Sequence, residues 1–154
     1  MSKNKSFLKS FKYAFCGIVT PFGEERNLRV HFSIANLIII FAYFFGITRI
    51  EWAILFLTIG FVIACELINT AVENAVDTAS TKISKTAKLA KDTAAGAVLF
   101  AAITAVITGF CLFFDTEKIV NTLTYIFATP KVLIPCLLVG IFDVLFIISG
   151  GKKH

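Results

Sequence analysis

Four polar side chains share one face of a strongly apolar segment, CELINTAVENAVD at residues 65–77. They are Glu66, Asn69, Glu73 and Asp77. At 100° per residue, their spacings of three, four and four residues place them within an arc of about 80° on one α-helix. A carboxylate within a membrane is costly and usually marks a functional site, so Glu66 is the first candidate for chemistry.

The three carboxylates of this stripe have no Lys or Arg among them. They therefore repel one another unless a cation neutralises them or some stay protonated. Their oxygen atoms suit Mg²⁺, which binds through one or two carboxylates and typically completes its shell with substrate phosphates. Glu24 or Glu25 could supply a further ligand by meeting Glu73 across a helix pair. An alternative stays open, in which Asn69 and Thr70 only join helices through a polar seam.

The elements that must position these residues are predicted to be membrane helices. Of the 154 residues, 57% are hydrophobic, and this composition lies well outside that of a soluble domain. A helix needs about 20 residues to cross the hydrocarbon core. Three segments meet that length, at about residues 31–47, 52–72 and 94–114. A fourth, at about residues 132–149, is shorter, contains Pro135 and Asp143, and is predicted to span as well.

The N-terminal region is predicted to lie on the membrane surface. Apolar side chains recur at helical spacing over about residues 5–20, with lysines at other positions, as in an amphipathic interfacial helix. Pro21 and Gly23 are expected to end this helix. A new helix is expected to start near Glu24, with acidic residues in its first turn.

Positive charges indicate the orientation of the chain. Lys and Arg gather in the first 30 residues and between the second and third spans. Because cytoplasmic loops carry an excess of these residues, both regions are predicted to be cytoplasmic. No secretory signal peptide is predicted, since residues 1–30 lack an apolar core followed by a cleavage site. The net charge of +5 is explained by this topology and by anionic lipid, so no nucleic-acid partner is expected.

Four motifs in this order, EERNLRVH, ITRIEW, CELINTAVENAVD and AKDTAAGAVL, resemble the prokaryotic diacylglycerol kinase family. The sequences of these motifs are most similar to those of the undecaprenol kinases of Gram-positive bacteria. The resemblance covers about residues 5–114 and implies an all-α lipid kinase domain at residues 1–114, with a surface helix and three transmembrane helices. It further implies a homotrimer in the bacterial plasma membrane, with sites at the cytosolic boundary. Residues 115–154 would form a C-terminal extension with the extra transmembrane helix.

Matching positions in the family's motifs imply roles for the central residues. Glu66 would be the general base, which takes the proton of a lipid hydroxyl as that hydroxyl attacks the γ-phosphate of ATP. Glu25 and Glu73 would hold the Mg²⁺ that bridges the phosphates. Asn69 would orient Glu66 or the acceptor. Arg29 would lie near the lipid headgroup.

The resemblance also implies a nucleotide site. Besides Glu25 and Glu73, it would contain Tyr13, Asp77, Ser84, Lys91 and Asp92. Lys91 would bind the phosphates, Asp77 would support the metal and nucleotide end, and Tyr13 would contact ATP from the surface helix. Lys91 and Asp92 also fit an ordinary interfacial anchor beside a helix-starting acid. The sequence has no GxxxxGK[ST], GxGxxG or HRD motif, so phosphate binding would rest on metal and lysine.

Two residues have no role assigned from the motifs. His31 fits the undecaprenol kinase wording, since an acid occupies this position in Gram-negative diacylglycerol kinases. As a single residue it is expected to be an interfacial polar side chain without chemistry. Asp143 has three explanations: a functional intramembrane acid, a partner for another polar group, or a side chain that reaches the inner surface.

Two classes of function are consistent with these features. The first is an ATP- and Mg²⁺-dependent lipid kinase that phosphorylates undecaprenol, with diacylglycerol as the alternative acceptor. The second is a small four-helix transporter or channel in which Glu66 and Asp143 couple ions. A nucleotide site requires Glu25 and the Lys91–Asp92 pair, whereas a transporter does not. A purely structural helper subunit would leave the carboxylate stripe unexplained.

Overall fold

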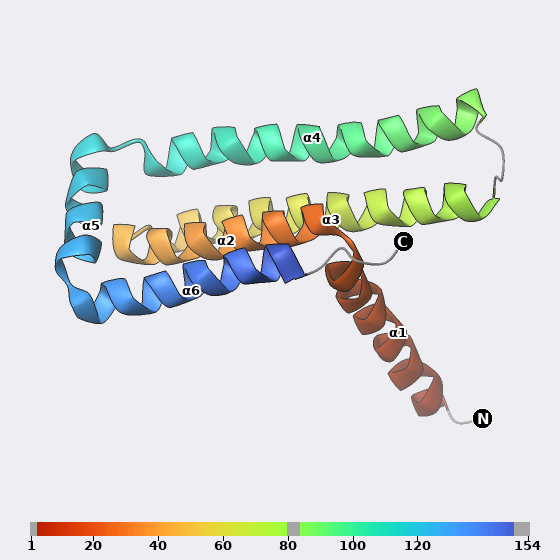
Figure 1. Cartoon of the computed structure of the whole chain (residues 1–154), viewed down its shortest axis with the longest axis horizontal. Coiled ribbons are helices and arrows are strands. Elements are labelled where there is room, and N and C mark those ends of the chain that lie inside the picture. The colour runs from red at the N-terminus through yellow and green to blue at the C-terminus, as the bar shows by residue number, and fades with distance from the viewer. Residues whose placement is uncertain (1–2, 80–83, 150–154) are drawn as a thin grey trace.

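The protein is almost entirely helical over the residues that the computed structural model describes, 3–79 and 84–149 (Figure 1). The helices are α1 (Lys3–Glu24), α2 (Arg26–Phe45), α3 (Arg49–Ala79), α4 (Lys85–Phe113), α5 (Thr116–Ala128) and α6 (Pro130–Ser149). Four of them, α2, α3, α4 and α6, are long and apolar enough to cross a membrane. The predicted fold class, an all-α integral membrane protein with a fourth spanning segment, is confirmed.

Helix α1 is longer than the predicted surface helix and continues through Pro21 and Gly23. The expected break at these residues is therefore wrong. The guanidinium group of Arg29 donates hydrogen bonds from Nη1 to the carbonyl oxygens of Phe22 (3.3 Å) and Gly23 (3.4 Å). Because carbonyls at a helix end need such partners, the helix ends one turn after the proline. Glu25 then adopts an extended conformation as the N-cap of α2, whose first turn contains no acidic residue, contrary to expectation.

A tight turn joins α2 to α3. Gly46 lies in the left-handed region (φ 70°), and its N–H donates to the carbonyl oxygen of Ala42 (3.0 Å). Thr48 and Glu51 then form a reciprocal cap at the start of α3. The Thr48 N–H donates to Glu51 Oε2 (2.6 Å), and the Glu51 N–H donates to Thr48 Oγ1 (3.4 Å). The turn therefore holds α2 and α3 as an antiparallel pair.

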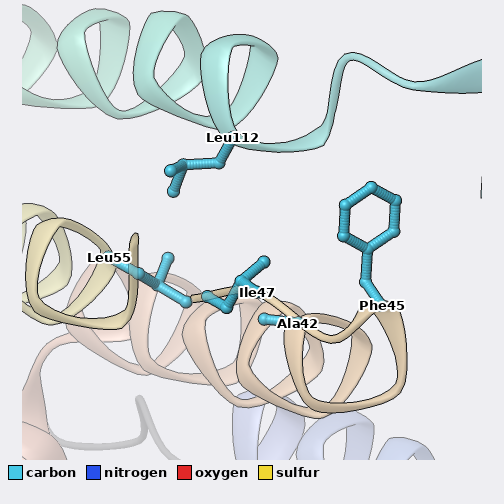
Figure 2. Close-up of a cluster of buried hydrophobic side chains, with 5 residues drawn as sticks. All are labelled: Ala42, Phe45, Ile47, Leu55 and Leu112. Atoms are coloured by element: carbon cyan, nitrogen blue, oxygen red, sulfur yellow. The ribbon is translucent and has the colours of Figure 1, made fainter. Parts of the chain in front are cut away.

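A small cluster of buried side chains holds this end of the bundle together (Figure 2). Its members come from α2, the turn, α3 and α4, and are Ala42, Phe45, Ile47, Leu55 and Leu112. The rings of Phe41 and Phe45 both pack edge-on against Phe113 of α4, at 5.3 Å between centroids. Lipid chains are as apolar as these side chains, so close packing rather than removal from water must stabilise the cluster.

The C-terminal extension contains a helix that the sequence did not predict. No helix is predicted from the sequence over residues 115–131, but α5 begins at the N-cap Asp115, whose Oδ1 accepts from the Lys118 N–H (2.9 Å). It crosses the end of the bundle (Figure 1), where Lys118 lies 4.3 Å from the ring centroid of Phe45. Helix α6 then returns along α2. Of the three explanations for Asp143, the structure shows a polar partner, Asn36.

The left-handed turn gives a test of the fold. We expect Gly46→Ala to lower the free energy of unfolding by about 1–2 kcal/mol, because a Cβ disfavours this conformation. Gly60→Ala is the matched control, since Gly60 is exposed, lies within α3 and has no atom near its added Cβ. Reversible unfolding in detergent micelles would measure both variants. Equal stability of Gly46→Ala and wild type would contradict this account of the turn.

Candidate functional site

Glu66 is buried within the bundle and contacts a histidine from the neighbouring helix. Its side chain is 4% exposed, and its Oε1 atom lies 3.1 Å from His31 Nε2. The two residues meet because the Gly46 turn folds α3 back along α2. From the sequence, His31 was expected to be an interfacial polar side chain with no catalytic role. The signal that could have paired them was the short turn at Gly46, which makes the two helices antiparallel neighbours.

Two more carboxylates lie near this pair. Glu25 and Glu73 are both close enough for their negative charges to repel that of Glu66. Glu25 reaches this region from the corner between α1 and α2, where it is half-buried. Glu73 lies two turns beyond Glu66 on the same face of α3, and its Oε1 atom accepts a hydrogen bond from Asn69 Nδ2 (2.9 Å). The side chains expected to act as base and metal ligands therefore share one neighbourhood.

Asn69 contacts Glu73 rather than Glu66. Its other polar atom, Oδ1, is buried and has no hydrogen-bond partner among the residues described. An unsatisfied amide oxygen at this depth is unfavourable and leaves an acceptor available to a ligand hydroxyl or to water. The single hydrogen bond fixes one oxygen of Glu73 and leaves the other oxygen of that carboxylate free of this contact.

The candidate nucleotide residues on α3 and α4 form a second, exposed group. Lys91 Nζ lies 2.5 Å from Asp77 Oδ1, and Asp92 is exposed beside Lys91. Ser84 caps α4, since its hydroxyl accepts a hydrogen bond from the Ala87 N–H (3.0 Å). This cap explains Ser84 by helix structure alone. The pair of Lys91 and Asp77 joins the last turns of α3 to the first turns of α4, where the two helices pack together.

Two candidates lie apart from these groups. Tyr13 is 70% exposed on α1, which leaves the bundle at an angle (Figure 1). No contact within the described ranges joins it to Lys91 or Asp77. Arg29 is 1% exposed and lies in the α1–α2 corner, where it satisfies the end of α1. Its Nε and Nη2 atoms are buried and find no partner in the part of the chain that the structure describes.

An apolar cavity of about 520 Å³ runs between α2, α3 and α4. His31 lines one end, and Phe41 and Phe113 line the other. The hydroxyl-bearing residues in the lining are Thr58 and Thr108, which donate to carbonyl oxygens of their own helices and so present no free donor. The cavity is therefore polar only at the end next to Glu66, which suits a molecule with an apolar chain and one polar head.

Comparison with known proteins gives a consistent set of relatives. The sequence model of the family described as prokaryotic diacylglycerol kinase matches residues 12–113. A diacylglycerol kinase of Synechocystis sp. is 44% identical over 108 residues, which make up 70% of this chain and 62% of that protein. The undecaprenol kinase of Bacillus subtilis is 41% identical over 107 residues, or 70% and 87% of the two chains. A diacylglycerol kinase of Haemophilus influenzae is 32% identical over 108 residues, or 70% and 92%.

The matched region ends where the bundle's third spanning helix ends. Residue 113 is the last residue of α4, so α5 and α6 lie outside the family match. The chain spans 62% of the length of the Synechocystis protein. No solved structure is significantly similar to the chain.

Proposed function

This chain belongs to the prokaryotic diacylglycerol kinase family, and from that premise we propose that it is a lipid kinase that transfers the γ-phosphate of ATP to the hydroxyl of undecaprenol. The observation that carries the proposal is the buried Glu66, which contacts His31 at the polar end of an apolar cavity. A lipid alcohol in this cavity would present its hydroxyl to the carboxylate. A transporter would need neither Glu25 nor the Lys91–Asp92 pair, which a nucleotide site requires.

Glu66 acts in this proposal as the general base. One of its oxygens takes the proton of the lipid hydroxyl as the hydroxyl oxygen attacks the γ-phosphorus. The bond between that phosphorus and the β–γ bridging oxygen breaks, and ADP leaves. His31 Nε2 lies 3.1 Å from Glu66 Oε1 and would hold that oxygen in place, which leaves Oε2 to accept the proton. Asn69 Oδ1, which has no partner in the described residues, is available to orient the acceptor hydroxyl.

Glu25 and Glu73 would hold Mg²⁺ in this proposal. Within the residues described, no group of three or more His, Cys, Asp or Glu side chains could hold a metal ion. Two carboxylates fit Mg²⁺ nonetheless, because this ion often binds through one or two carboxylates, water and substrate phosphates. When bound, the ion neutralises charge on the phosphates. The hydrogen bond from Asn69 orients Glu73 for this task.

The nucleotide would bind at the cytosolic ends of α3 and α4. Lys91 would turn from Asp77 to the phosphates, which is feasible because both side chains of this pair are exposed. An exposed ion pair of this kind contributes only about 0–1 kcal/mol, so the exchange costs little. Asp92, Ser84 and Tyr13 complete the proposed nucleotide set. Tyr13 would need α1 of the same or a neighbouring subunit to lie over the phosphates.

A homotrimer in the bacterial plasma membrane, with the N-terminus in the cytoplasm, is part of the proposal. Helix α4 packs on α3 and exposes large apolar side chains, among them Phe100, Ile103 and Phe110. These surfaces are suited to lipid or to neighbouring subunits.

Arg29, with two buried donors that lack partners in the described part of the chain, lies at the corner where an acidic headgroup or a phosphate oxygen would pass.

The base assignment predicts a large loss of turnover. Glu66→Gln should lower kcat by about 10²–10⁴, the usual contribution of a general base, and should leave the KM for ATP nearly unchanged. Glu117→Gln is the control, because Glu117 is an exposed carboxylate on α5. Steady-state assays in mixed micelles with ATP and Mg²⁺ would measure both. Wild-type turnover in Glu66→Gln would remove Glu66 from this role.

The acceptor is tested by direct comparison. Purified protein should phosphorylate undecaprenol with a higher kcat/KM than diacylglycerol, and both should exceed ATP hydrolysis by water. Undecaprenol is expected to be preferred because the motif sequences, including His31, resemble those of undecaprenol kinases. A higher kcat/KM for diacylglycerol would assign the alternative acceptor. Failure of folded protein to phosphorylate either lipid would overturn the kinase proposal.

A further inference from the structure

Helix α2 carries polar residues on the side that faces away from the candidate site. Arg29, Ser33 and Asn36 are spaced by four and three residues and fall within about 60° on one face of the helix. All three are buried or half-buried, although His31 and the apolar cavity lie on the opposite side of α2. The proposed kinase chemistry gives a role to Arg29 but none to Ser33 or Asn36. The second polar face therefore requires its own explanation.

Helix α6 covers this second face. Asn36 Nδ2 donates a hydrogen bond to Asp143 Oδ1 (3.1 Å), and Asp143 is 2% exposed. Burying a carboxylate in the spanning region is costly, and one hydrogen bond to an amide recovers only part of that cost. A single polar pair in an apolar interface selects one register, because any other register leaves both groups unpaired. Asn36 and Asp143 thus fix how far α6 lies along α2.

The register set by this pair brings Phe146 to the corner between α1 and α2. Phe146 lies about one turn beyond Asp143, toward the end of α6. Its ring lies 6.3 Å from Phe22 of α1 and 6.3 Å from Phe32 of α2, and these two rings are 5.3 Å apart. Aromatic pairs at these distances attract one another beyond simple burial. Three helices therefore meet in one aromatic cluster, Phe22, Phe32 and Phe146.

The same corner positions Glu25. The carbonyl oxygen of Phe22 accepts from Arg29, and Glu25 follows three residues later as the extended N-cap of α2. Helix α1 is otherwise largely exposed, so few contacts besides the corner fix its direction. Movement of Phe22 would be transmitted to Glu25 through these few residues.

We propose that α6 is an intramembrane brace, in which Asp143 and Phe146 are positioning residues that hold the α1–α2 corner and thereby keep Glu25 beside Glu66. The brace lies outside the region that the family model matches. Its effect on catalysis rests on the proposed function, since Glu25 matters there as a ligand of Mg²⁺. Its effect on the α1–α2 corner does not depend on the proposed function.

The test uses the full chain in micelles with two readouts. The disruptive variants are Phe146→Ala, which removes the aromatic contacts with Phe22 and Phe32, and Asp143→Leu, which removes the hydrogen bond with Asn36. The conservative variant is Asp143→Asn, whose amide oxygen still accepts from Asn36. Leu145→Ala is the matched control, because Leu145 is 60% exposed on the same turn of α6. The readouts are amide hydrogen exchange over residues 20–28 and the Mg²⁺ concentration for half-maximal activity.

We expect both disruptive variants to exchange about fivefold faster or more at the corner, because the local opening that permits exchange becomes easier. They should also need about fivefold more Mg²⁺, with the KM for the lipid unchanged, since a misplaced ligand weakens binding of the ion rather than of the acceptor. Asp143→Asn and Leu145→Ala should resemble wild type in both readouts.

The outcomes separate the two proposals. Unchanged exchange over residues 20–28 in both disruptive variants would overturn the brace, and so would equal acceleration in Leu145→Ala. If wild type phosphorylates no lipid, the proposed function has failed, and the exchange readout still decides the brace. Faster exchange with an unchanged Mg²⁺ requirement would overturn the link from the brace to Glu25.

Discussion

The contact between His31 and Glu66 is the interaction on which the candidate site depends. A carboxylate buried between membrane helices is stable only if neighbouring groups compensate for the water that it loses. The His31 Nε2 atom at 3.1 Å provides this compensation, and it comes from another helix. The site therefore requires α2 and α3 to keep one depth and one rotation. The turn at Gly46, the cap formed by Thr48 and Glu51, and the packed cluster at that end of the bundle supply both constraints.

The two faces of α2 have different roles. One face presents His31 to Glu66 and lines the apolar cavity, which we propose holds the lipid alcohol. The other face receives α6 through Asn36 and Asp143. Membrane helices gain little from apolar contact alone, because lipid offers the same contact. Polar pairs such as these two therefore largely determine which helices become neighbours. Both pairs consist of one acidic residue and one residue of α2.

The sequence was sufficient for much of this account. Apolar length predicted the four spanning helices, and the spacing of Glu66, Asn69 and Glu73 predicted their common face. The contact with His31 was missed because pairing across two helices depends on the turn that sets their register. Helix α5 was missed because charged residues at its start hid its apolar spacing. The end of α1 was misplaced because Arg29, six to seven residues away, decides it.

A double-mutant cycle between His31 and Glu66 tests the central claim most directly. It would compare kcat of the wild type, His31→Leu, Glu66→Gln and the double variant, with unfolding of each checked in micelles. If His31 acts through Glu66, the two losses will not multiply, and His31→Leu will cost little more once Glu66 is changed. Losses that multiply fully would show that the two residues act independently, which would contradict the account.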